Sequence, residues 1–168
     1  NLISVRHDID TETLFTLGTG NRRINVTSSR DALSGYQKGK CFFCFGDISV
    51  LNGSELMADV DHFFAHVLQR ERVVDGLDGV WNLVLACKDC NRGSGGKFAT
   101  VPELRFLDRL HTRNEFLISS HHPLRETLIL QTGDNEHARA KHLQSCYRQA
   151  KTHLIQSWRP TFEHEPAF

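Results

Sequence analysis

Apolar residues in the C-terminal third of the chain recur at the spacing of amphipathic helices. In "VPELRFLDRLHTRNEFLISS" charged residues separate the apolar ones, and Pro102 suits the first turn of a helix. The apolar face of this helix is Leu104, Leu107, Leu110 and Leu117. "HPLRETLILQTG" predicts a second helix that ends at Gly133. Residues 135–158 predict a third helix, whose apolar face is Leu143, Cys146 or Tyr147, Ala150, Leu154 and Trp158. Each face is only wide enough to meet a core, so we expect the three helices to pack as a shell.

Shorter apolar runs, typical of strands, occupy the middle of the chain. "LNGSELMADVDHFF" predicts a hairpin with its turn at Asn52 and Gly53 and with "ELMADV" as the strand that follows. The run Trp81 to Ala86 predicts a strand after a loop rich in Gly and Asp. Nearer the start, "TLGTGNRR" indicates a loop, "RINV" a short strand, and "SSRDALSGYQKGK" a helix that a serine can cap and Gly39 can end. Helices and strands together predict an α+β fold.

The composition is that of a folded protein of ordinary size. The chain has 168 residues, of which 24% are charged and 39% hydrophobic, which fits one domain with a real core. No apolar run is long enough to span a bilayer, and "NLISVRHDID" lacks the apolar centre of a secretory signal, so we expect a cytoplasmic protein. Because the sequence begins with Asn, we also expect it to be a fragment of a longer chain whose other domains are candidate partners.

The formal net charge is zero, with 20 basic and 20 acidic residues, so a surface that binds nucleic acid would have to be local. The candidate basic groups are Arg22 with Arg23, Arg92 with Lys97, and Lys141 with Arg148 and Lys151. The first and last groups fit ordinary solvated charge equally well. Arg92 and Lys97 differ because they flank a candidate site.

Four of the five cysteines form two C-x-x-C pairs, "CFFC" and "CKDC". This spacing lets two thiolates on one turn occupy adjacent corners of a tetrahedral Zn²⁺ site, and two such pairs supply all four ligands. The sequence therefore predicts a closed, structural zinc site made by Cys41, Cys44, Cys87 and Cys90. A redox-active dithiol is the less favoured alternative, because two pairs occur and neither follows a βα pattern. Cys146 is expected to lie in the core.

A polar cluster, "DVDHFFAH", lies between the two cysteine pairs. Together with "CFFC" and "WNLVLACKDCNRGSGGK", it resembles the HNH endonucleases, in the version of the ββα-metal fold that carries zinc knuckles. The resemblance covers about residues 38 to 97 and rests on the Asp-His pair, a middle Asn, a final Asn and both knuckles occurring in order. The chain departs from the family at Ala65, where the family often has Pro.

The resemblance implies a small ββα-metal core with a role for each motif residue. His62 would be the general base, because a neutral imidazole can accept a proton from the attacking water. Asp61 and Asn91 would supply oxygen ligands for a catalytic Mg²⁺ or Mn²⁺ ion. Asn82 would be a scaffold whose amide holds the loop that presents His62.

Further residues around the motif have more open roles. Arg92 and Lys97 could bind phosphates beside the scissile one. His66 fits a second metal ligand, a phosphate contact or a surface histidine equally well. Phe63 and Phe64 are expected to be core residues rather than stacking platforms for bases.

The predicted activity is metal-dependent hydrolysis of phosphodiester bonds in DNA, with double-stranded DNA as the partner and restriction or phage defence as a setting by analogy. Cutting both DNA strands would require a homodimer or two successive binding and cleavage events by one protein. The alternatives are a catalytically silent, zinc-stabilised nucleic-acid-binding module and an RNA-directed nuclease. We expect residues 1–37 to form an N-terminal extension, 38–100 the nuclease core, and 101–168 a helical extension packed on it.

Overall fold

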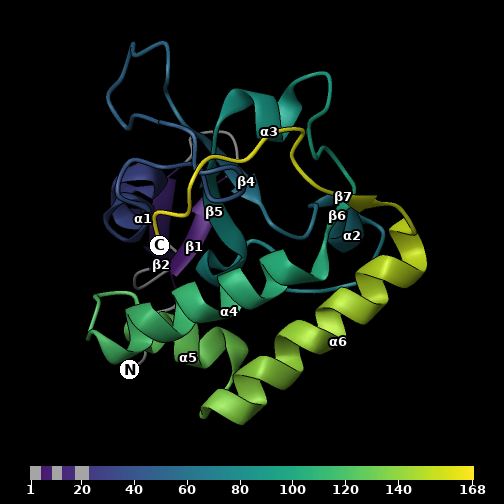
Figure 1. Ribbon diagram of the computed structural model, residues 1–168. Coiled ribbons are helices and arrows are strands. Elements are labelled where there is room, and N and C mark those ends of the chain that lie inside the picture. The colour runs from purple at the N-terminus through teal and green to yellow at the C-terminus, as the bar shows by residue number, and fades with distance from the viewer. Residues whose placement is uncertain (1–4, 9–12, 18–22) are drawn as a thin grey trace.

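The computed structural model describes residues 5–8, 13–17 and 23–168, with side chains from Arg30 onward (Figure 1). Helices and strands are both present, which confirms the predicted α+β class. No helix in these ranges is long and apolar enough to cross a membrane.

A three-stranded antiparallel sheet lies near the start of the chain. Its strands are β1 (Val5–Asp8), β2 (Thr13–Leu17) and β3 (Arg23–Ser28), in the order β1-β2-β3. The predicted strand "RINV" is part of β3, but β1 and β2 were not expected. The predicted loop over residues 16–23 is partly wrong, since Thr16 and Leu17 belong to β2, and its residues 18–22 lie outside the described ones.

The predicted N-terminal helix is confirmed as α1 (Ser29–Gln37), which follows β3 directly. The chain leaves it through Gly39, whose φ of +73° suits a residue without a Cβ. At its C-terminal end, the Gln37 side chain accepts a hydrogen bond from Leu85 N at 2.9 Å and donates one to Leu85 O at 2.8 Å. These bonds join α1 to β5 (Leu83–Ala86).

The central unit is an antiparallel pair of strands followed by a short helix. β4 (Asp59–His62) pairs with β5, with Asp61 opposite Val84 and His62 opposite Leu83. A 3-10 turn, η2 (Val80–Asn82), precedes β5, so the predicted strand begins at Leu83 rather than Trp81. The helix α3 (Lys88–Arg92) follows β5, and α2 (Val67–Arg70) lies between the two strands in sequence.

The predicted hairpin before β4 does not form. Instead, Ser49 N donates to Leu56 O and Ala58 N donates to Ser49 O, both at 2.8 Å, and a parallel bridge joins Ser49 to Met57. These contacts close residues 49–58 as a loop, so the strand begins at Asp59 and not at Glu55. The backbone polar groups are satisfied without a long ladder.

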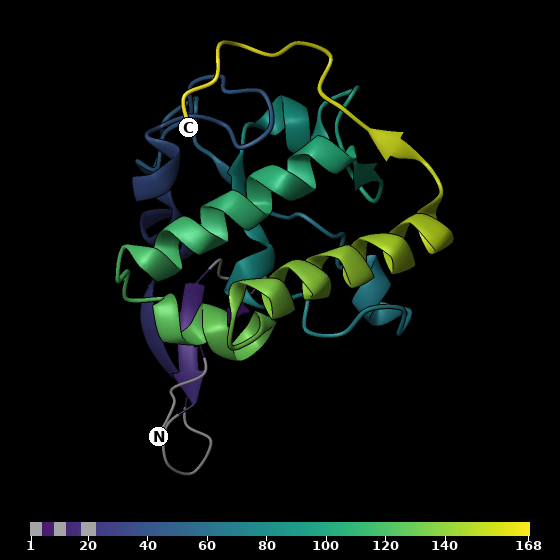
Figure 2. The same cartoon turned by 60° about the horizontal axis from the view of Figure 1, so that its bottom comes forward.

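The three predicted C-terminal helices are confirmed as α4 (Leu104–Ser119), α5 (Arg125–Thr132) and α6 (Glu136–Leu154). They pack against one another (Figure 2), on the side of the molecule opposite α3 (Figure 1). Pro102 lies before α4, not in its first turn, because β6 (Val101–Pro102) pairs in parallel with β7 (Ser157–Trp158). Trp158 is therefore in a strand rather than on α6, and Leu104 is 57% exposed rather than on the buried face.

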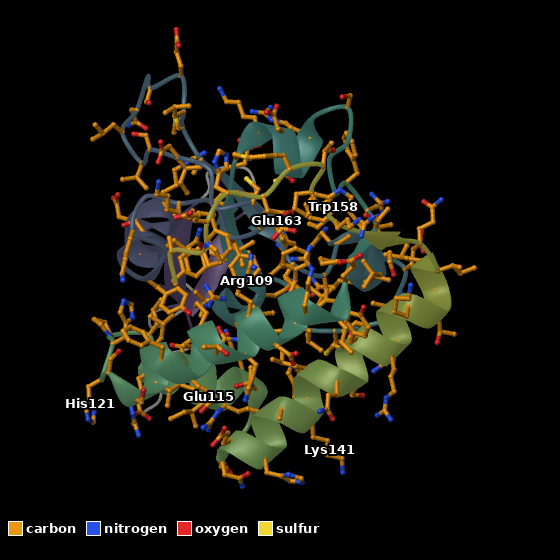
Figure 3. All side chains as sticks on the ribbon, in the orientation of Figure 1. Arg109, Glu115, His121, Lys141, Trp158 and Glu163 are labelled. Atoms are coloured by element: carbon orange, nitrogen blue, oxygen red, sulfur yellow. The ribbon has the colours of Figure 1, made fainter. Side chains whose placement is uncertain are left out.

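Two arginines attach α4 to the central unit and to the first cysteine pair. Arg113 is buried and donates to Leu83 O at 2.9 Å and to Trp81 O at 3.1 Å. Burial lowers the pKa of this guanidinium to about 10. Arg109, labelled in Figure 3, donates to Phe43 O at 2.9 Å. The helical shell is thus hydrogen-bonded to the backbone of the elements that carry the candidate site.

The segment after β7 crosses the molecule above α4 and passes α3 (Figure 1). Trp158 Nε1 donates to Gly95 O at 2.7 Å, and His164 N donates to Cys44 O at 2.8 Å. The ring centroid of Phe168 lies 4.9 Å from that of Phe45 and 5.2 Å from that of Tyr36. Figure 3 shows Trp158 and Glu163, which belong to β7 and to the segment after it. Glu163 forms an ion pair with Arg105 of α4.

Candidate metal and catalytic site

The four cysteines of the two pairs converge at one point. Their sulfur atoms all lie within 4.8 Å of one another, and the Sγ atoms of Cys44 and Cys87 are 3.7 Å apart. Sulfurs bound to zinc at about 2.3 Å in a tetrahedron are about 3.8 Å apart, so the cluster has the dimensions of such a site. The cluster could therefore hold a structural metal such as zinc.

Backbone donors around the cluster also suit thiolate ligands. Cys87 N donates to Cys41 Sγ at 3.3 Å, Gly46 N to Cys44 Sγ at 3.4 Å, and Cys90 N to Cys87 Sγ at 3.4 Å. Because metal binding requires deprotonated sulfur, these donors favour the ligating form.

The fifth cysteine, Cys146, belongs to a different environment. It is buried on α6, as predicted, with its sulfur 3.8 Å from His142 Nε2. Burial raises the pKa of its thiol to about 11, so it is mainly protonated at neutral pH.

Asn91 lies over the face of β4 that carries Asp59 and Asp61. Asn91 Nδ2 donates to Asp59 Oδ2 at 2.9 Å, and Arg92 Nε lies 2.9 Å from the same oxygen. Residues two apart in a strand share a face, so Asp59 and Asp61 point the same way. The structure thus brings the predicted ligands Asp61 and Asn91 to one side of the strand and adds Asp59, which the sequence analysis did not include. The Arg92 side chain remains 59% exposed.

Lys97 lies in a different place from the predicted phosphate contact. Its side chain is fully buried, and its ammonium is 3.2 Å from Asp61 Oδ2 and donates to His62 O at 2.9 Å and to Phe98 O at 3.3 Å. A lysine in this position cannot reach a phosphate on the surface, so its role as a nucleic-acid contact is corrected to that of a buried partner of Asp61. Burial raises the pKa of the Asp61 carboxyl, and the adjacent Lys97 ammonium opposes that effect.

Asn82 is fully buried between two loops. Its Oδ1 accepts from Phe64 N at 2.8 Å, and its Nδ2 donates to Phe64 O and to Leu77 O, both at 3.0 Å. Phe63 N donates to Asn82 O at 2.7 Å. These bonds hold the backbone just after His62, which is the geometry expected of a scaffold. Phe63 and Phe64 are buried, as predicted.

His62 and His66 face a common carboxylate. The Nε2 atom of His62 lies 3.4 Å from Asp78 Oδ1, and that of His66 lies 3.3 Å from the same oxygen. The interaction with the His62 imidazole is the main reason why the pKa of Asp78 is lowered to about 2, so this group is a carboxylate at neutral pH. The sequence analysis missed Asp78, whose only signal was a carboxylate in a glycine-rich loop.

A groove of about 610 Å³ lies beside the cysteine cluster, and Gly93, Gly95, Trp158, Thr161 and His164 are among its lining residues. It does not include Asp61, His62 or Asn91. The groove therefore follows the cysteine cluster and the C-terminal segment rather than the polar cluster on β4.

Comparison with protein-family models, with curated proteins and with solved structures finds no match to this chain.

Proposed function

We propose that this protein is a metal-dependent endonuclease of the HNH type that hydrolyses phosphodiester bonds in DNA. The observation that carries the proposal is the unit β4–β5–α3, in which Asp61 and His62 end one strand and Asn91 lies on the helix over the same strand. The cysteine cluster lies at the start of that helix, where a structural zinc would fix its position relative to the strands.

Each motif residue has a chemical task in this proposal. His62 accepts a proton from the attacking water. Asp61 and Asn91 offer a carboxylate and an amide oxygen to Mg²⁺ or Mn²⁺, which when bound would neutralise charge at the phosphate and at the leaving oxygen. Asn82 holds the backbone that follows His62. The exposed Arg92 binds a neighbouring phosphate.

The test is a plasmid-nicking assay with Mg²⁺, Mn²⁺ or EDTA. We expect nicking that requires a divalent metal and falls by at least about 1,000-fold in His62→Ala, because the base is removed. His121→Ala, an exposed histidine in the turn after α4, is the matched control and should nick as the unchanged protein does. Intact plasmid in every metal, from a folded and zinc-loaded protein, would contradict the proposal.

One observation favours a second candidate, a catalytically silent nucleic-acid-binding module. Asp61, the proposed metal ligand, is paired with the Lys97 ammonium at 3.2 Å, so a metal ion would have to share this carboxylate with a cation. Such a module would retard DNA in a gel-shift assay without cutting it. Parallel assays with single-stranded RNA distinguish the RNA-directed alternative.

A further inference from the structure

Asp78 is held by contacts on both of its carboxylate oxygens. Oδ1 faces the two imidazoles, at 3.4 Å from His62 Nε2 and 3.3 Å from His66 Nε2. Oδ2 accepts a hydrogen bond from Gln69 Nε2 at 2.8 Å. The Gln69 amide is itself oriented, because its Oε1 accepts from Leu77 N at 2.6 Å. The carboxylate therefore has one orientation, with Oδ1 directed at the histidines.

The loop that carries Asp78 is also fixed. Leu77 is buried, and its carbonyl accepts from Asn82 Nδ2 at 3.0 Å. Trp81 Nε1 donates to Gly76 O at 3.1 Å, and a Cβ on Gly79 would lie 2.5 Å from the Trp81 ring. Glycine at position 79 thus allows the loop to pack directly on the indole.

Asn82 joins this loop to the segment that carries His62. One amide binds the backbone of Phe64, two residues after His62, and that of Leu77, one residue before Asp78. The buried Asn82 side chain therefore sets the distance between the backbone segments that carry His62 and Asp78. It does so through the neighbouring residues Phe64 and Leu77, without binding the imidazole of His62 or the carboxylate of Asp78. Such support is what a precisely oriented pair requires.

We propose that Asp78 is the positioning residue of the site, orienting the His62 imidazole by accepting a hydrogen bond from its Nε2–H group. This inference rests on the proposed nuclease function for its chemical consequence. In this tautomer the lone pair lies on Nδ1, which takes the proton of the attacking water. The water oxygen then forms a bond to phosphorus, the bond from phosphorus to the leaving sugar oxygen breaks, and that oxygen takes a proton from solvent.

His66 lies on the solvent side of the same carboxylate. Its side chain is 39% exposed, whereas that of His62 is 7% exposed, and the two ring centroids are 5.4 Å apart. A carboxylate oxygen has two lone pairs and can accept from both rings. The tautomer of His62 therefore has to be measured separately from that of His66.

The first measurement is the tautomer of His62 by long-range ¹H–¹⁵N NMR at pH 8, with the His62 signals assigned from their loss in His62→Ala. We expect the Nε2–H tautomer in the unchanged protein and in Asp78→Asn, whose amide oxygen can still accept a hydrogen bond from Nε2–H. Asp78→Ala should shift the ring to a mixture of tautomers. Asp75→Ala, an exposed aspartate in the same loop, should leave the spectrum unchanged. An unaltered His62 spectrum in Asp78→Ala would overturn the inference.

The second measurement is single-turnover nicking. We expect Asp78→Ala to lower the cleavage rate by on the order of 100-fold at saturating DNA while DNA affinity changes less than about twofold. Gln69→Ala, which releases Oδ2, should give a smaller loss, and Asp78→Asn should retain more activity than Asp78→Ala. A loss confined to DNA affinity would contradict the positioning role.

The NMR readout needs no activity, so the two proposals can fail separately. If the unchanged protein does not nick DNA, the proposed function fails. The NMR spectrum still tests whether Asp78 orients the His62 imidazole. If the protein nicks and Asp78→Ala changes neither the spectrum nor the rate, only the role of Asp78 fails.

Discussion

The buried Lys97 side chain provides the positive charge that compensates the Asp61 carboxylate. Its ammonium is fully buried and lies between the Asp61 carboxylate and two backbone carbonyls. A buried charge is costly unless it is paired and hydrogen-bonded, and here both conditions are met. The loop after α3 is thereby tied to the end of β4, where Asp61 and His62 lie.

Replacing Lys97 with Met should destabilise the protein by about 3–5 kcal/mol, because Asp61 would keep a buried carboxylate without its cation. Urea unfolding measures the change. The double variant Lys97→Met with Asp61→Asn should recover part of the loss, since the uncompensated charge is removed. Lys88→Met, at an exposed position on α3, is the control and should change the free energy of unfolding by less than about 0.5 kcal/mol. Equal effects at both positions would contradict the importance of the buried pair.

Helices α4 and α6 of the C-terminal shell are joined by a contact that depends on charge. Arg139 on α6 pairs with Glu115 on α4, and its NH2 group donates to Glu115 Oε2 at 2.9 Å. The Arg139 guanidinium lowers the pKa of Glu115 below its ordinary value. A carboxyl with a lowered folded-state pKa stabilises the fold above its ordinary pKa and loses that contribution as the pH falls through the folded value.

The variant Glu115→Gln should therefore be less stable than the unchanged protein by about 0.5–1 kcal/mol at pH 7. The difference should shrink as the pH falls below the ordinary pKa of a glutamate and disappear once the pH is below the lowered folded-state pKa, because the unchanged protein then also becomes neutral at this position. Denaturant unfolding across this pH range measures it. Glu55→Gln, at an exposed position in the loop before β4, should show no such pH-dependent difference. A constant offset across the range would refute the assignment to charge.

At the scale of the whole molecule, the cysteine cluster joins distant parts of the chain. Cys41 follows α1, and Cys87 caps α3 after β5. The C-terminal segment adds a hydrogen bond from His164 N to Cys44 O at 2.8 Å. Loss of a metal bound by these cysteines would therefore weaken the attachment of both the segment after α1 and the start of α3.

We expect purified protein to contain about one zinc per chain and to lose it in Cys87→Ser, whereas Cys146→Ser keeps it because Cys146 lies outside the cluster. Removing the metal with a chelator should lower the midpoint of thermal unfolding by at least about 10 °C, since structural zinc contributes several kcal/mol to folding. An unchanged midpoint after complete zinc removal would show that the cluster does not stabilise the fold through a metal.

Local patterns in the sequence determined the parts of the fold that depend on nearby residues. The helical spacing predicted α4, α5 and α6, and Gly133 ends α5 as expected, with a φ of +141°. Two C-x-x-C pairs were enough to predict a cysteine cluster, because each pair needs only one tight turn. The short strands β1 and β2 were not predicted, because the preference of a residue for a strand depends on packing against neighbours that are distant in sequence.

Only the tertiary structure decided which polar groups meet at the site. Lys97 is an ordinary basic residue in sequence, but packing of the loop after α3 buries it against Asp61. Asp78 stands in a glycine-rich loop without a motif, but the amide of Asn82 sets that loop beside His62. Periodicity and spacing describe a residue's own element, whereas the partner of a buried charge depends on how separate elements pack, which no local pattern contains.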